Sequence, residues 1–152
     1  DLKNFKGLDF FEFDSTYVVD AKIQETPDSL PFKMKTTTDT HADFRKYGTL
    51  IFNLADEQYT LTAYENLDYL DAEGYENYLF LPFLDKTNGF ETYGGGRYID
   101  LFLNNEDSIT IDFNRSYNPQ CVYDEDFSCP IVPRNNLLNI RIEAGVKNFV
   151  KN

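Results

Sequence analysis

Short runs in which apolar and polar residues alternate dominate the chain, and this period of two predicts β-strands. The clearest runs, bounded by polar turns, cover residues 17–23, 32–36, 47–54, 59–64, 98–103, 108–113 and 138–143. Two further runs, residues 8–13 and 79–83, are rich in the aromatic and aliphatic side chains that strands favour. Residues 66–78 are acidic and keep no helical period, which is typical of a surface loop, and residues 85–89 contain an Asn-Gly turn signal.

The pattern predicts an all-β fold of roughly ten short strands with no long helix. Parallel strands would need crossover helices, so we expect an antiparallel sheet. Residues 47–54 should pair with residues 59–64, and residues 98–103 with residues 108–113, as hairpins. Because consecutive hairpins dominate, we expect one barrel-like domain over residues 1–152, although pattern alone does not separate a barrel from a sandwich.

The charge balance limits the kinds of partner. The 152 residues include 26 acidic and 14 basic side chains, which gives a formal net charge of −12. A field of that sign repels phosphate, so the sequence argues against nucleic acid and against anionic membrane surfaces. The chain is 41% hydrophobic with 14 Phe and 11 Tyr, which indicates a packed core. No segment approaches the ~18 apolar residues of a membrane span.

Two polar motifs supply candidate binding residues. Three consecutive glycines lie between Tyr93 and Arg97, and residues 112–121 concentrate amides, a carboxylate and a thiol. The predicted hairpin carries one motif on each side of its open end, so we expect Arg97 to lie near Asn114. Arg97 would then anchor an anionic or carbonyl group of an unidentified small ligand or protein partner. The predicted ligand-binding set is Tyr93, Gly95, Arg97, Asp112, Asn114, Tyr117, Asn118 and Asn136.

Each part of this set also has a structural interpretation. The glycines lack the ending and the following helix of a phosphate-binding loop, so they fit a tight strand junction or an amide nest for an anion. Arg97 fits an ion pair with Asp112 across adjacent strands as well as a ligand carboxylate. The asparagines are typical of turns that side-chain hydrogen bonds close.

The cysteines and the single histidine restrict the chemistry. Cys121, Cys129 and His41 do not make the usual Cys/His zinc set, and we predict no metal and no cofactor. The two cysteines bracket a short acidic loop, either as reduced thiols or as one disulfide. Cys121 has no histidine near it in sequence to lower its pKa, which argues against a catalytic cysteine. Catalytic residues stay unassigned.

Longer motifs add a family resemblance over nearly the whole chain. The glycine run with Arg97, the run from Asp112 through Asn118 to Cys121, and the Cys129-Pro130 pair resemble an uncharacterised domain-of-unknown-function family of bacteria and archaea. The resemblance implies no reaction. Asn135 and Val146 stand where the family pattern tends to have glutamate.

The resemblance also implies that Cys121 and Cys129 lie close together, and that a leader or anchor segment precedes Asp1 in relatives. The sequence begins at Asp1 and not at Met, as a processed chain does. On these grounds we predict a Cys121–Cys129 disulfide and an extracytoplasmic location, with the cytoplasm as the alternative. The leading functional prediction is a binding or accessory domain of the cell envelope. The alternatives are an enzyme of unknown reaction at the same site and a subunit of a larger envelope assembly.

Overall fold

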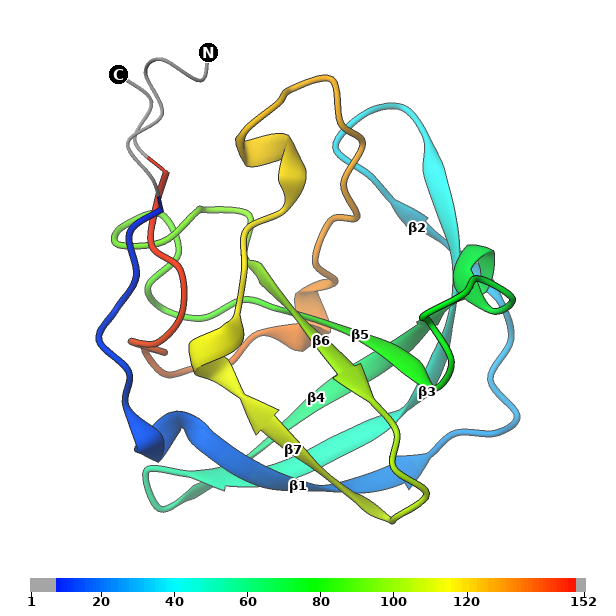
Figure 1. Ribbon diagram of the computed structural model, residues 1–152, viewed down its shortest axis with the longest axis horizontal. Helices are drawn as coiled ribbons and strands as arrows, with labels where there is room; N and C mark the ends of the chain where they lie inside the picture. The colour runs from blue at the N-terminus through cyan, green and yellow to red at the C-terminus, as the bar shows by residue number, and fades with distance from the viewer. Residues whose placement is uncertain (1–7, 150–152) are drawn as a thin grey trace.

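The computed structural model describes residues 8–149, in which the chain forms a curved antiparallel sheet of seven strands (Figure 1). The order across the sheet is β6-β5-β4-β3-β1-β7, with β2 paired to β3. The all-β, antiparallel, barrel-like prediction is confirmed, with seven strands in place of roughly ten. The strands are β1 (Val18–Glu25), β2 (Phe32–Lys35), β3 (His41–Leu54), β4 (Glu57–Asn66), β5 (Tyr78–Phe83), β6 (Arg97–Phe102) and β7 (Ser108–Asp112).

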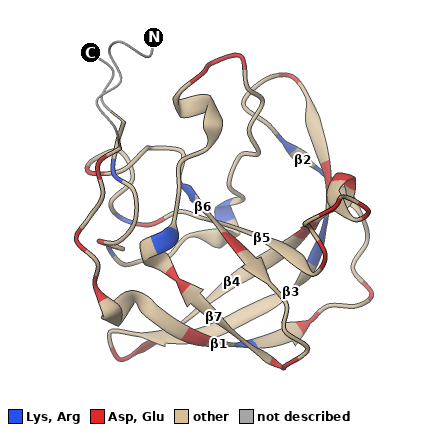
Figure 2. Cartoon of the chain, in the orientation of Figure 1, with Lys and Arg blue, Asp and Glu red and all other residues tan. Residues whose placement is uncertain are grey.

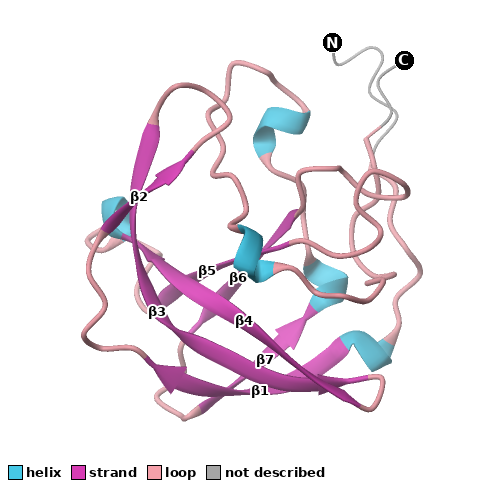
Figure 3. Cartoon of the chain, turned by 180° about the vertical axis from the view of Figure 1, so that it is seen from behind, coloured by secondary structure: helices cyan, strands magenta, loops and turns pink. Residues whose placement is uncertain are grey.

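The helical segments described are short 3-10 turns: one precedes β1, one lies between β4 and β5, and the others follow β7 (Figure 3). Each has three residues, too few to bury an apolar face of its own. They therefore shape loops and do not form a second layer over the sheet. They are η2 (Ser15–Tyr17), η3 (Leu67–Tyr69), η4 (Phe113–Arg115), η5 (Gln120–Val122) and η6 (Arg134–Asn136).

The two end strands of the sheet, β6 and β7, make the seam of the barrel. β6 pairs with β5 from Tyr78↔Phe102 to Phe83↔Arg97, while β7 pairs with β1. The predicted hairpin of residues 98–103 with residues 108–113 is therefore wrong. The connection opens because Leu103 N donates to Asn77 O, and Asp107 O accepts from Ile23 N, each at 2.8 Å. The Leu103 end of the connection thus bonds to the segment directly before β5, and the Asp107 end bonds to β1.

The predicted hairpin of residues 47–54 with residues 59–64 is confirmed, in the longer strands β3 and β4. Its turn is shorter than the sequence suggested, because Leu54 already pairs with Glu57. Ala55 and Asp56 have φ of 51° and 64°, as in the two-residue turns that match the strand twist. A bulge at Tyr47 shifts the β3–β4 register between Lys46 and Gly48.

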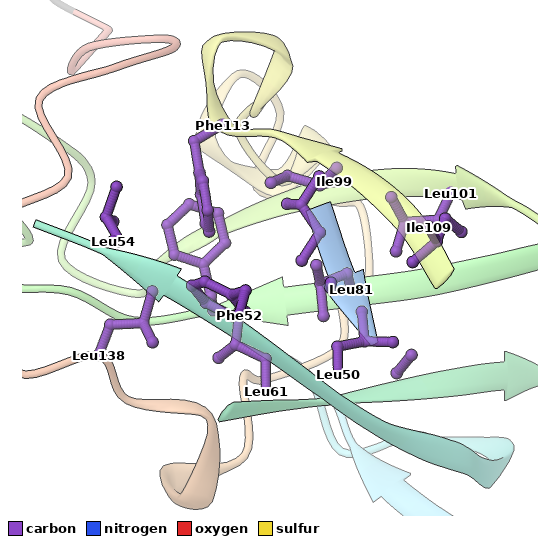
Figure 4. Close-up of a cluster of buried hydrophobic side chains, with 14 of the residues drawn as sticks. Leu50, Phe52, Leu54, Leu61, Leu81, Ile99, Leu101, Ile109, Phe113 and Leu138 are labelled. Atoms are coloured by element: carbon purple, nitrogen blue, oxygen red, sulfur yellow. The ribbon is translucent and has the colours of Figure 1, made fainter. Parts of the chain in front are cut away.

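Inward-facing aliphatic and aromatic side chains fill the barrel (Figure 4). Leu50 and Phe52 of β3 and Leu61 and Ala63 of β4 are buried on the shared face that the alternation predicted. Leu81, Ile99, Ile111 and Phe113 approach them from the other strands. The barrel interior is therefore a packed core, so a ligand site is to be sought on the outside or at the ends.

A second apolar cluster lies on the outer face of the sheet. Phe44, Tyr64, Phe80 and Tyr98 pack there with Met34 of β2 and Val132 of the long connection after η5. The Tyr47 bulge places Phe44 in this outer cluster and Leu50 in the barrel, although both are even-numbered residues of one strand. A loop thus covers part of the outer wall of β4, β5 and β6.

Two predicted strands are not strands. Residues 8–13 make only an isolated bridge between Phe10 and Val146. Residues 138–143 bend at Asn139 and Ile140, although Leu138 and Ile142 are buried as the alternation predicted. Their backbone groups bond to individual atoms of other segments, since Leu138 N donates to Leu84 O and Ile142 N to Asp85 Oδ2. Alternation identified the buried face, but no neighbouring strand is available to make a ladder.

Candidate functional site

Arg97 lies at the start of β6 and is fully buried. The guanidinium nitrogen Nη2 donates to Asp85 Oδ1 at 3.3 Å and to Ile142 O at 3.0 Å. The second terminal nitrogen, Nη1, donates to the carbonyls of Ala144 and Val146. Burial lowers the pKa of Arg97 and Asp85 opposes this, and the guanidinium remains charged. Arg97 therefore clasps the C-terminal segment to the barrel, and the predicted pairing with Asp112 is wrong.

Asp85 is the buried counter-charge of this clasp and closes the turn after β5. Its carboxylate accepts from Thr87 N, Thr87 Oγ1 and Asn88 Nδ2 as well as from Arg97 and Ile142 N. A buried carboxylate with this many donors is held in one orientation. The Asp85–Arg97 pair thereby connects the turn, β6 and the C-terminal segment.

The glycine run forms a tight junction that leads into β6. Gly96 N donates to Tyr93 O at 3.1 Å, and Gly96 has φ of +94°. A Cβ on Gly96 would lie 2.6 Å from Phe83 O, and one on Gly95 would meet the Tyr93 ring at 2.5 Å. Close packing against the Phe83 backbone therefore accounts for Gly96, and close packing against the Tyr93 ring accounts for Gly95. A Cβ on Gly94, by contrast, would lie 3.9 Å from its nearest neighbour, so the position has room for a side chain.

The polar residues after β7 hold neighbouring backbone in place. Asp112 Oδ1 accepts from Asn114 N and Asn114 Nδ2, and Asn114 exchanges hydrogen bonds with the backbone of Asp14. Asn118 Nδ2 donates to Tyr123 Oη at 3.0 Å. Arg97 and Asn114 thus bond to different partners, so the expected contact between them does not form.

Asn136 is a buried bridge between β4 and β5. Its Oδ1 accepts from Thr62 N at 2.9 Å, and its Nδ2 donates to Thr62 O and Pro82 O at 2.8 Å each. The two strands share one backbone pair, Tyr64↔Phe80, and Pro82 has no N–H to offer. The Asn136 amide therefore supplies the hydrogen bonds that the strands themselves do not make.

The two cysteines are neighbours, as predicted, but the predicted disulfide between them is not formed. Cys121 and Cys129 are both free thiols, and Cys121 N donates to Cys129 Sγ at 3.0 Å. Burial, followed by the hydrogen bond with Cys121, raises the pKa of Cys129 to about 12. A thiol with so high a pKa stays protonated and is a poor nucleophile.

The two predicted motifs do converge at one point. Tyr98 and Tyr117 form an antiparallel bridge, with both N–H···O bonds at 2.9 Å, and their rings meet edge to face at 5.8 Å. Tyr117 is 37% exposed, whereas Arg97 and Asn136 are fully buried. Of the predicted set, Tyr117 therefore has a partly exposed side chain on the outer surface beside β6.

Beside Tyr117 lies a pocket of about 340 Å³ on the outer face of β5 and β6, which we call the tyrosine pocket. Phe80, Tyr98 and Asp100 belong to the strands, the η3 loop adds tyrosines, and the connection after β7 supplies the opposite wall. Eight of its fourteen lining residues are aromatic. The lining residues are Phe44, Asn66, Tyr69, Tyr75, Tyr78, Phe80, Tyr98, Asp100, Tyr117, Gln120, Phe127, Ser128, Cys129 and Pro130.

One carboxylate joins the two walls of the tyrosine pocket. Asp100 Oδ1 accepts from Tyr78 Oη at 2.7 Å and from Tyr117 Oη at 2.6 Å. Burial, then the proximity of Tyr117 and Asp100, raises the pKa of Tyr78. Burial, then the hydrogen bond to Asp100, raises that of Tyr117. Both phenols therefore remain protonated donors to Asp100.

Sequence reasoning missed most of this pocket. Tyr69 and Tyr75 lie in the segment that was interpreted as an acidic surface loop, and Asp100 is one residue of a predicted strand. Tyr69 and Tyr75 pack at 4.7 Å between ring centroids, and Tyr75 meets Tyr78 at 5.2 Å. The available signal was the density of tyrosine, three in residues 66–78, in an otherwise acidic loop.

The described residues also bear on two other features, a metal site and a membrane-spanning helix. Within residues 8–149, no group of three or more His, Cys, Asp or Glu side chains is placed to hold a metal ion. In that same range no helix has the length and apolar character needed to cross a membrane.

The chain is similar to proteins whose roles are not described. The family model "Protein of unknown function (DUF1684)" matches residues 3–147. A solution NMR structure of an uncharacterized protein from Haloarcula marismortui, gene locus rrnAC0354, is 35% identical, with a TM-score of 0.75. The match covers 96% of this chain and 78% of that one. No curated protein matches the chain.

Proposed function

The chain belongs to the DUF1684 family, and we propose that it is a binding domain whose tyrosine pocket takes a small organic ligand. The observation that carries the proposal is the pocket itself, about 340 Å³ of space lined by aromatic rings with a few polar groups. Ligand sites in proteins are typically concave, mostly apolar and of this size range. The barrel interior is filled, so the outer wall is where the fold leaves room.

The polar groups of the pocket favour binding over covalent chemistry. The phenols of Tyr78 and Tyr117 are protonated and already bonded to Asp100. Cys129 has its pKa raised to about 12 and so holds its proton. A nucleophile needs an adjacent base or a lowered pKa, and these groups have the opposite. They can orient a ligand by hydrogen bonds and ring contacts.

The walls of the pocket are held in place before any ligand arrives. Tyr75 N donates to Ala72 O, and Tyr78 N to Tyr75 O, each at 3.2 Å, which closes the η3 loop into successive turns. On the opposite wall, the Tyr98 hydroxyl donates to Pro130 O. A preformed site loses little conformational entropy on binding, which favours affinity for small ligands.

The envelope role and extracytoplasmic location stay predictions, which fractionation of native cells would test.

The proposal is tested by an NMR screen of a chemically mixed set of small ligands against the wild type, Tyr75→Ala and Phe90→Ala. Tyr75 is 40% exposed in the pocket, and Phe90 is 74% exposed outside it, so neither substitution disturbs the core. We expect at least one ligand class to bind the wild type and Phe90→Ala and to lose most of its affinity for Tyr75→Ala. Ligands that bind all three proteins equally, or no binding at all, would refute the pocket as the site.

A further inference from the structure

Aromatic rings from several segments of the chain line the tyrosine pocket. Tyr69, Tyr75 and Tyr78 form one continuous aromatic wall, with ring centroids 4.7 to 6.3 Å apart. Phe80 and Tyr98 form the floor, at 4.7 Å from each other. The face of an aromatic ring is electron-rich and attracts cations. Such a surface favours a ligand with a positive, weakly hydrated group.

The hydrogen bonds among Tyr78, Tyr117 and Asp100 leave acceptors rather than donors in this part of the pocket. The hydroxyl protons of Tyr78 and Tyr117 are both directed to Asp100 Oδ1, so a ligand meets the oxygen lone pairs and the rings of these tyrosines. Asp100 Oδ2 accepts from neither phenol and adds a full negative charge. Among the described lining residues there is no Lys, Arg or His to hold an anion.

The two loops beside the pocket carry charge of one sign. Residues 66–77, which contain η3, include four acidic residues and no basic one, and residues 120–130 on the opposite wall include three acidic residues and no basic one. Figure 2 shows acidic residues on both loops. Walls of one sign focus the field and raise the local concentration of the opposite ion. The acidic residues are Asp68, Asp71, Glu73, Glu76, Asp124, Glu125 and Asp126.

From this combination we propose that the tyrosine pocket binds an organic cation, the alkylated ammonium group of a small molecule. The inference rests on the proposed function and names its ligand class. Aromatic faces replace the hydration of an alkylated ammonium at low cost, because that ion is weakly hydrated. Asp100 supplies the counter-charge in the lining of the pocket, and the acidic loops attract the ion over a longer range.

Choline and its uncharged carbon analogue 3,3-dimethyl-1-butanol test the inference, because the two molecules have nearly the same shape. We expect choline to bind the wild type at least about tenfold more tightly, measured by NMR titration at low ionic strength. Asp100→Asn should weaken choline binding about threefold to tenfold and leave the neutral analogue unchanged. Asp56→Asn, which removes one charge in the β3–β4 turn outside the pocket, should leave both affinities unchanged.

The outcomes separate the ligand class from the proposed function. If both molecules bind equally, or if a neutral sugar or an anion of the mixed screen binds instead, the cation inference is overturned and the binding function stands. If choline and the screen both give no binding, both proposals fail. If Asp100→Asn loses its fold by circular dichroism, the comparison of the two ligands on the wild type still decides the matter.

Discussion

Replacing Arg97 with methionine is expected to destabilise the fold strongly, because it breaks a buried ion pair and keeps the apolar stem. The Arg97 and Asp85 side chains are both 0% exposed. Removing one partner of such a pair leaves an uncompensated charge and costs about 3–5 kcal/mol. The carbonyls of Ile142, Ala144 and Val146 lose their donor as well. We expect a loss of about 4 kcal/mol, or about 8–16 °C in Tm.

Urea unfolding at 25 °C, followed by far-ultraviolet circular dichroism, measures this loss. The matched control is Arg45→Met, since Arg45 pairs with Glu65 at 2.9 Å on the surface, with side chains 37% and 21% exposed. An exposed pair of this kind contributes less than about 1 kcal/mol. Arg97→Lys keeps a charge beside Asp85 but loses the fork that reaches three carbonyls, so its stability should lie between the wild type and Arg97→Met. If Arg97→Met costs no more than Arg45→Met, the clasp is refuted.

Three further predictions concern single positions. Asn136→Ala should lower the free energy of unfolding by about 3 kcal/mol, because three backbone groups lose their hydrogen-bond partner. Asn139→Ala, on the exposed side, should leave the free energy of unfolding almost unchanged in the same urea assay. Gly96→Ala should cost about 1–3 kcal/mol through its positive φ and the contact with Phe83 O, whereas Gly94→Ala should be neutral; equal effects would contradict this geometry. Cys129 has a pKa raised from 9.0 to about 12, so the unfolded state releases its proton first and stability should fall from pH 9 to 12. Cys129→Ala should show a shallower fall over that range, and an unchanged slope would exclude this thiol as a cause.

Local pattern predicted the strands well because burial on one face imposes a period of two. The β3–β4 hairpin and the buried faces of Leu50 and Leu61 follow from that period and from a short turn. The seam was not predictable in this way, since the choice between β7 joining β6 or β1 depends on the curvature of the whole sheet. Residues 138–143 show the same limit, because alternation reports burial and not the presence of a partner strand.

The candidate site was harder to predict than the fold. Arg97 was predicted to anchor a ligand or to pair with Asp112, whereas its partner is Asp85. Asp85 lies in a turn twelve residues earlier, and nothing in the spacing joins the two residues. Tyr117 was identified for its motif, and the structure places it in the tyrosine pocket. Tyr69 and Tyr75 reach the same pocket only because the η3 loop folds over the outer wall, which is a long-range property of the chain.

The central claim, that the tyrosine pocket binds an organic cation, is tested most directly by observing the tyrosine rings. The measurement is an NMR titration of protein labelled with ¹³C in its tyrosine rings, using tetramethylammonium chloride against equal sodium chloride. We predict saturable shifts at the pocket residues Tyr69, Tyr75, Tyr78 and Tyr117. Tyr17 of η2 and Tyr59 of β4, which lie outside the pocket, should be unchanged. Shifts that match those in sodium chloride, or that concentrate on tyrosines outside the pocket, would contradict the account.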